Sequence, residues 1–165
     1  MSIRIEVDDP LRPPVRQLIL EHLHSEMALS PPESVHALRP EALTAVNVTF
    51  WTAWQGDELV GCCALRLLDS EHGEVKTMRT REAFRGQGVG RALLENLIRV
   101  AHNRGLARLS LETGTTVHFE AARRLYRRLG FVECGPFWAY QGSPHSFFMA
   151  RMLSEPHPQD TRVEP

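Results

Sequence analysis

A glycine-rich stretch between two regular segments constrains this chain more than any other feature. Residues 85–91 read Arg-Gly-Gln-Gly-Val-Gly-Arg, after a strand-like run at residues 74–80 and before a helical run that ends near Arg104. Glycines at alternate positions let the main chain turn tightly and approach a ligand without an intervening side chain. The N–H groups that open the helix lack partners within it and carry partial positive charge. The stretch therefore predicts a pocket for a phosphate or pyrophosphate.

The sequence of this stretch matches neither of two common phosphate-binding loops. A P-loop requires a Gly-Lys pair followed by Ser or Thr, and no such lysine follows the glycines. A dinucleotide fingerprint requires glycines at the first, third and sixth positions. Counted from Gly86, the third position is Gly88, but the sixth is Arg91. What remains is Arg-x-x-Gly-x-Gly, and the alternative is a plain strand–turn–helix connection whose glycines serve only the turn.

Length and charge narrow the function classes. The 165 residues fit one domain with a substantial core. The net charge of −1 argues against a broad nucleic-acid surface, so we expect no nucleic-acid partner. Positive charge is instead local, which suggests a site for one small anionic ligand. The arginines that supply it are Arg79, Arg81, Arg85 and Arg91.

The cysteines, the N-terminal pattern, the apolar runs and the histidines favour a cytoplasmic protein with no metal site and no membrane span. The three cysteines, Cys62, Cys63 and Cys134, show no framework spacing and suggest reduced thiols. The N-terminus enters a strand pattern directly, unlike a signal peptide. No apolar run approaches the roughly 18 residues of a membrane span. The eight histidines show no zinc spacing, so we expect no metal site.

Hydrophobic periodicity predicts an α/β fold of one domain over residues 1–153, followed by a disordered tail at residues 154–165. The predicted architecture is a mixed, mostly antiparallel central sheet of about six to seven strands flanked by helices. We expect strands over residues 3–7, 48–54, 59–68, 74–80, 108–112, 131–134 and 146–152, and helices over about residues 15–27, 40–45, 89–104 and 117–129.

Two stretches resemble the GNAT family of N-acetyltransferases, and the resemblance extends to about Leu153. Residues 85–94, Arg-Gly-Gln-Gly-Val-Gly-Arg-Ala-Leu-Leu, are similar to the family's acetyl-CoA loop. Residues 121–131 resemble its final helix and strand at the expected separation, so the pair is far more specific than either stretch alone. Shorter strings look like the bacterial YsnE-like subgroup; they are residues 30–38, 49–51, 78–80, 109–114 and 130–137.

The resemblance implies the GNAT-like acyl-CoA N-acyltransferase fold and acetyl-CoA as co-substrate. It puts the pantetheine arm beside residues 76–80, where an N–H near Met78 would stabilise an oxyanion by roughly 3 kcal/mol. Many members carry an asparagine seven positions before the helix tyrosine, where this chain has Phe119, whose ring could pack against the arm instead. The candidate cofactor-binding residues are Met78, Arg79, Thr80, Arg85, Gly86, Gln87, Gly88, Val89, Gly90, Arg91 and Phe119.

The same resemblance suggests the catalytic groups. Tyr126 shares a helix stripe with Phe119 and is the candidate general acid for the departing thiolate. The alternative is a core tyrosine with a hydrogen-bonded hydroxyl. Glu112 or Glu74 could act as base through water, although either could equally be a surface or ion-paired carboxylate.

The predicted function is transfer of an acetyl group from acetyl-CoA to a primary amine of a small molecule or amino acid derivative, directly in a ternary complex. Glu33, Ser34 and His36 follow the first helix, in a loop that borders the acceptor site in this family; a solvated loop is the alternative. A non-catalytic acyl-CoA-binding sensor and a nucleotide-binding module are the competing functions, and the failed glycine spacing counts against the latter. A homodimer could form through the strand at residues 48–54.

Overall fold

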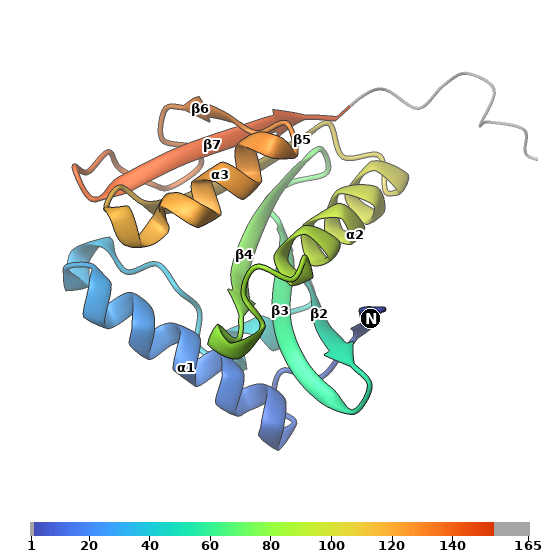
Figure 1. Ribbon diagram of the computed structural model, residues 1–165. Coiled ribbons are helices and arrows are strands. Elements are labelled where there is room, and N and C mark those ends of the chain that lie inside the picture. Colours follow the sequence, from blue (N-terminus) through green and yellow to red (C-terminus); the bar gives the residue numbers. More distant parts are fainter. Residues whose placement is uncertain (1, 154–165) are drawn as a thin grey trace, which may run out of the picture.

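The computed structural model describes residues 2–153 and contains one seven-stranded sheet with helices on its two faces (Figure 1). The strand order is β1-β2-β3-β4-β5-β7-β6. Every neighbouring pair is antiparallel except β4 and β5. The strands are β1 (Arg4–Val7), β2 (Val48–Gln55), β3 (Glu58–Leu67), β4 (His72–Thr80), β5 (Arg108–Gly114), β6 (Val132–Cys134) and β7 (Ser146–Met152).

The helices agree closely with the sequence-based expectations. They are α1 (Pro13–Leu29), α2 (Val89–Asn103) and α3 (Glu120–Arg128), with short 3-10 turns η1 (Pro32–Ser34), η2 (Pro40–Thr44), η3 (Glu82–Phe84) and η4 (Val117–Phe119). Gly105, with φ +80°, follows the end of α2 in the left-handed conformation that favours glycine. The predicted fold class is confirmed. The predicted tail lies outside the described residues.

The sheet separates two hydrophobic cores. On one face α1 contributes Val15, Leu18 and Ile19, which pack against the Cys62 side of β3. On the other face the buried stripe of α2 packs with Tyr126 of α3 against the Cys63 side of the same strand. Successive strand residues point to opposite faces, so the two neighbouring cysteines fall into different cores and remain free thiols.

The strand β2 is paired on both sides. Its residues Val48–Gln55 pair with β3, and the segment around Trp51 to Trp54 also pairs with β1. β1 therefore occupies this edge of β2 at Trp51–Trp54, and a homodimer through residues 48–54 stays a prediction.

The two central strands separate after a short parallel contact. β4 and β5 pair only at His72↔Arg108, Gly73↔Leu109 and Glu74↔Ser110. Both strands continue beyond these pairs, and β4 runs away from β5 and β7 in Figure 1. The second half of β4 therefore has an edge without a strand partner, at the centre of the sheet.

A β-bulge shapes the same half of β4. Cys62 of β3 pairs with Arg79, and Ala64 pairs with Lys76, so Thr77 and Met78 together oppose one β3 residue. Thr77 has φ +54°, which is strained for a β-branched residue. The bulge turns the backbone where the strand leaves its parallel partner. Within residues 2–153, the helices are too short or too polar to cross a membrane.

Candidate functional site

The glycine-rich loop adopts the open conformation that an anion requires. Gly86 has φ +75° and Gly88 has φ +86°, and a Cβ built on either would meet no atom within 4 Å. These two glycines therefore adopt the left-handed backbone conformation without strain and leave the space beside the backbone empty. Gly88 is the N-cap of α2 and supplies no side-chain hydrogen bond to the first turn. The N–H donors at this helix terminus therefore lack a capping side chain and fit a phosphate group.

Of the other loop residues, some hold the start of α2 in place and the rest are exposed to solvent. Val89 is buried in the core and fixes the start of α2. A Cβ on Gly90 would lie 3.1 Å from Leu125, so this glycine allows α2 to pack closely against α3. Arg85 and Gln87 are exposed. Arg91 is exposed too, and its Nε lies 2.7 Å from Glu95 Oε1.

Met78, Arg79 and Thr80 continue β4 from the bulge toward η3 and the glycine-rich loop. Because the ladder to β5 ends at Glu74, this stretch has no strand partner on its β5 side. Such an edge suits an extended ligand that hydrogen-bonds as an added strand would. The predicted cofactor residues of β4 and of the loop thus lie along one continuous path.

Tyr126 lies on α3 and is almost wholly buried. Its ring packs edge-on against Phe131 at a centroid distance of 5.9 Å. Its hydroxyl forms no hydrogen bond with the residues that the structure describes, unlike the hydroxyl of an ordinary core tyrosine. Burial raises the pKa of Tyr126, and the nearby Glu26, Cys63 and Glu112 act in the same direction. The phenol is therefore neutral at physiological pH and retains its proton.

Phe119 is buried at the start of α3 and faces the end of β5. A Cβ added at Gly114 would overlap the Phe119 ring, so the glycine is needed for this contact. The aromatic ring consequently closes the space beside Gly114, where β5 ends.

Glu112 is half-buried on β5, on the side opposite Leu111. Burial raises its pKa to about 7, while the Ser146 hydroxyl and Lys76 act in the opposite direction. Glu26 of α1 and Glu74 raise this pKa further by charge repulsion. A carboxyl group with this pKa changes its protonation near neutral pH, as a general base requires.

Glu74 is fully buried within a set of polar partners. Its Oε1 accepts hydrogen bonds from Arg66 Nη2 at 2.6 Å and from Arg66 Nε at 3.1 Å. Its Oε2 accepts a hydrogen bond from the Tyr140 hydroxyl and lies 3.8 Å from Lys76 Nζ. Both oxygens are engaged, so this carboxylate fixes its neighbours and is badly placed to take a proton from a substrate.

A cavity of about 590 Å³ opens above these partners. The predicted acceptor residues Glu33, Ser34 and His36 all line it, brought there by the η1 segment after α1. The opposite wall is the loop between β6 and β7, and Ser34 Oγ lies 3.2 Å from Ser143 Oγ across the two segments. We call this cavity the acceptor pocket, after the predicted acceptor residues that line it.

Lys76 fixes the floor of the acceptor pocket. Its Nζ donates to the main-chain oxygen of His36 at 2.8 Å and to the Tyr140 hydroxyl at 3.0 Å. Burial lowers the pKa of Lys76, whereas Glu74 acts to raise it. Burial and Lys76 lower the pKa of His36, which favours the neutral imidazole.

Sequence reasoning missed several residues of this pocket. Arg66 pairs in register with Glu74 across the β3–β4 hairpin, so hairpin alignment could have found it. Lys76 lies two positions after Glu74 on the same face of β4 and gives the same signal. Trp138 and Tyr140 lie in a loop without periodicity, where no sequence signal points to the pocket.

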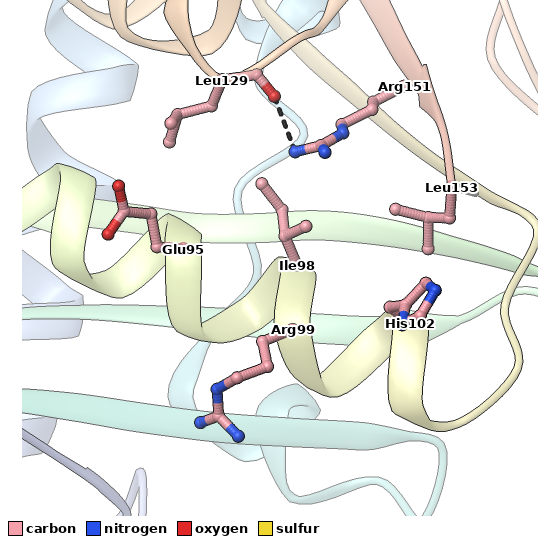
Figure 2. Close-up of a pocket in the computed structure, with 7 residues that line it drawn as sticks. All are labelled: Glu95, Ile98, Arg99, His102, Leu129, Arg151 and Leu153. Atoms are coloured by element: carbon pink, nitrogen blue, oxygen red, sulfur yellow. Dashed lines mark hydrogen bonds between the residues drawn. The ribbon is translucent and has the colours of Figure 1, made fainter. Parts of the chain in front are cut away.

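A second hollow, of about 260 Å³, lies between α2 and the end of β7 (Figure 2). Arg151 crosses it and donates from Nη1 to the main-chain oxygen of Leu129 at 2.8 Å. None of the candidate site residues lines it. Its lining residues are Glu95, Ile98, Arg99, His102, Leu129, Arg151 and Leu153.

Comparison with known proteins agrees with this geometry. The Acetyltransferase (GNAT) family matches residues 16–131. The chain is 48% identical over 151 residues to the uncharacterized N-acetyltransferase YsnE of Bacillus subtilis, covering 92% of this chain and 100% of that protein. It is 44% identical over 151 residues to the uncharacterized N-acetyltransferase YedL of Escherichia coli, covering 92% and 95%.

A solved structure agrees as well. The putative acyl-CoA N-acyltransferase of Klebsiella pneumoniae has a TM-score of 0.76 and 30% identity, covering 93% of this chain and 99% of that one. The fold, the family match and the two bacterial relatives agree: the chain belongs to the GNAT family of N-acetyltransferases, among its YsnE-like members.

Proposed function

We propose that this protein transfers the acetyl group of acetyl-CoA to a primary amine of a small molecule or amino acid derivative, directly in a ternary complex. One observation carries the proposal: the unpaired stretch of β4 leads from the acceptor pocket at Lys76 toward the glycine-rich loop. A donor bound along this edge and an acceptor bound in the pocket would meet near Met78. Direct transfer requires such a meeting point.

The donor site follows from the open loop and the unpaired strand edge. Amides of Gln87 to Arg91 would hold the pyrophosphate, and Arg85 and Arg91 would approach the outer phosphates. The edge formed by Met78, Arg79 and Thr80 would hold the pantetheine arm. Bound acetyl-CoA supplies an activated thioester, and the Met78 N–H would polarise its carbonyl. Phe119 would form an apolar wall at the end of β5.

Tyr126 would act as the general acid. Its phenol keeps its proton because burial raises its pKa, and its hydroxyl has no partner among the described residues. As the carbon–sulfur bond breaks, the phenol would donate its proton to the departing sulfur. The attacking nitrogen would then return a proton to the phenolate, which is a stronger base than a thiolate of pKa near ~8.5.

Glu112 is the better supported base of the two candidate carboxylates. It is half-buried and its charge interacts with that of Lys76, whereas Glu74 is occupied by Arg66 and Tyr140. Glu112 would accept a proton from the acceptor ammonium, through water, before the amine attacks. Glu74 would instead position Lys76 and Tyr140.

The rate should depend on pH through this carboxyl group. Burial raises the pKa of Glu112 to about 7, so the base form is present above that pH and is lost as the pH falls. We expect kcat/KM to rise with pH through about 7, and Glu112→Gln to remove this rise and lower the plateau by about tenfold to a hundredfold. An exposed glutamate on α3 provides the control: Glu120→Gln should keep the wild-type profile. An unchanged profile in Glu112→Gln would exclude the base role.

The function itself is tested by acetyl transfer to a broad panel of amines. We expect free CoA to accumulate only with an amine present, together with one acetylated product. Tight binding of acetyl-CoA without turnover on any amine would indicate a sensor instead. The free thiols of Cys62, Cys63 and Cys134 support the cytoplasm as the compartment in which to seek the acceptor.

A further inference from the structure

Two cationic side chains, Arg66 and Lys76, line the acceptor pocket. Both approach the buried carboxylate of Glu74. The charge of Lys76 is also offset by the nearby carboxyl groups of Glu112 and Glu26. Glu33 lines the pocket too but is exposed, so solvent screens its charge. A cation that lines a partly buried pocket favours an opposite charge on the ligand.

Arg66 is the group best placed to meet such a charge. Its Nε and Nη2 bond to Glu74, while its Nη1 forms no hydrogen bond with the described residues. Its side chain is 29% exposed and lines the cavity. A guanidinium that is fixed on one edge and open on another binds carboxylates with a defined orientation. Hydrogen bonds to His36 and Tyr140 fix the ammonium group of Lys76, which adds positive charge from a set position.

The strand spacing separates this anion-binding end from the transfer point. Arg66 pairs in register with Glu74, which lies four positions before Met78 on β4. At about 3.3 Å per residue, four positions correspond to about 13 Å, less a small amount for the bulge. In an α-amino acid the nitrogen and the carboxyl group share one carbon atom, so such a molecule is too short to reach both ends. The cavity of about 590 Å³ has room for a longer one.

Trp138 supplies an apolar surface at this pocket. Its side chain lines the cavity although the residue is 60% exposed, and its φ is +54°. A positive φ is unfavourable for a bulky residue, and strain of this kind is concentrated at functional sites. An exposed indole beside a binding pocket suits a hydrocarbon spacer.

We propose that the acceptor is an extended amino carboxylate, with its acid group at the end far from the reacting amine. The carboxylate pairs with Arg66, the spacer lies against Trp138, and the amine reaches the thioester near Met78. This inference rests on the proposed function, because it takes the pocket as the acceptor site.

Calorimetric titration tests the inference with matched ligands, in the presence and in the absence of saturating CoA. The ligands are ω-amino acids of increasing chain length, each compared with its terminal carboxamide, and the corresponding α-amino acids. We expect the longer ω-amino acids to bind about tenfold to a hundredfold more tightly than their carboxamides and than the α-amino acids. Arg66→Gln should remove the preference for the acid and leave CoA affinity unchanged. Arg99→Gln, an exposed arginine beside the second hollow, should keep it.

The affinities of the wild-type protein for the acids and the carboxamides test the inference even if Arg66→Gln folds poorly. Equal affinity for acid and carboxamide, tighter binding of α-amino acids, or no binding of any ligand would overturn the inference. A clear preference for the long acids without CoA binding or acetyl transfer would support the anion site and overturn the proposed function alone.

Discussion

Replacing Tyr126 with phenylalanine is expected to lower kcat by about a hundredfold to a thousandfold, which lies within the range for loss of a positioned general acid. The change removes only the hydroxyl, which forms no hydrogen bond with the described residues. Packing of the ring against Phe131 is retained. The Kd for acetyl-CoA should therefore stay within about twofold, because the phenol acts on the departing thiolate and holds no part of the nucleotide. Steady-state kinetics and calorimetry measure the two quantities.

Thermal unfolding of the same variant separates this role from a structural one. A hydroxyl without a partner among residues 2–153 contributes little to stability, so we expect the Tm of Tyr126→Phe to match the wild type or rise slightly. A lowered Tm with unchanged kcat would assign Tyr126 to the core and exclude the acid role.

Replacing Gly88 with alanine is expected to weaken acetyl-CoA binding by about a hundredfold. Gly88 has φ +86° at the N-cap of α2, and its surroundings are empty within 4 Å of a built Cβ. A methyl group there strains the backbone and enters the space that the pyrophosphate would use. Both effects disturb the N–H groups that the account assigns to the phosphate.

Gly105 provides the matched control for this change. It has φ +80°, and a built Cβ likewise meets no atom within 4 Å, but it lies beyond the opposite end of α2. Gly88→Ala and Gly105→Ala should lose similar stability, about 1 kcal/mol, from the strained backbone. Only Gly88→Ala should lose acetyl-CoA affinity. Equal affinities in the two variants would show that the loop does not hold the donor.

The fold could be predicted from the sequence because its local signals agree with one another. Hydrophobic periodicity predicted a strand over residues 108–112 and a helix over residues 89–104, and the structure contains β5 and α2 there. Strand order was less accessible, because it depends on long-range pairing. For that reason the sequence did not show that β1, far away in the chain, occupies the edge of β2 at Trp51–Trp54.

In the candidate site too, the part formed by a local segment was predictable and the part formed by long-range contacts was not. The glycine-rich loop is one local segment, and its spacing predicted a tight turn into a helix whose first N–H groups lack partners. The structure has this turn, with positive φ at Gly86 and Gly88 and no side-chain cap on α2. The acceptor pocket instead combines the η1 segment, the β3–β4 hairpin and the loop before β7. From the sequence, Glu74 was a possible base, because its burial depends on Arg66 and Tyr140 and these contacts cannot be read from the sequence. Only the assembled fold shows that these partners occupy it.

The central claim is that the glycine-rich loop holds the diphosphate of acetyl-CoA while the unpaired edge of β4 holds the pantetheine arm. Calorimetric titration with acetyl-CoA and with acetyl-pantetheine, which lacks the diphosphate and the nucleotide, tests this most directly. We expect acetyl-CoA to bind with one-to-one stoichiometry, and acetyl-pantetheine to bind at least about a hundredfold more weakly. Equal affinity for the two thioesters, or no measurable binding of acetyl-CoA, would contradict it.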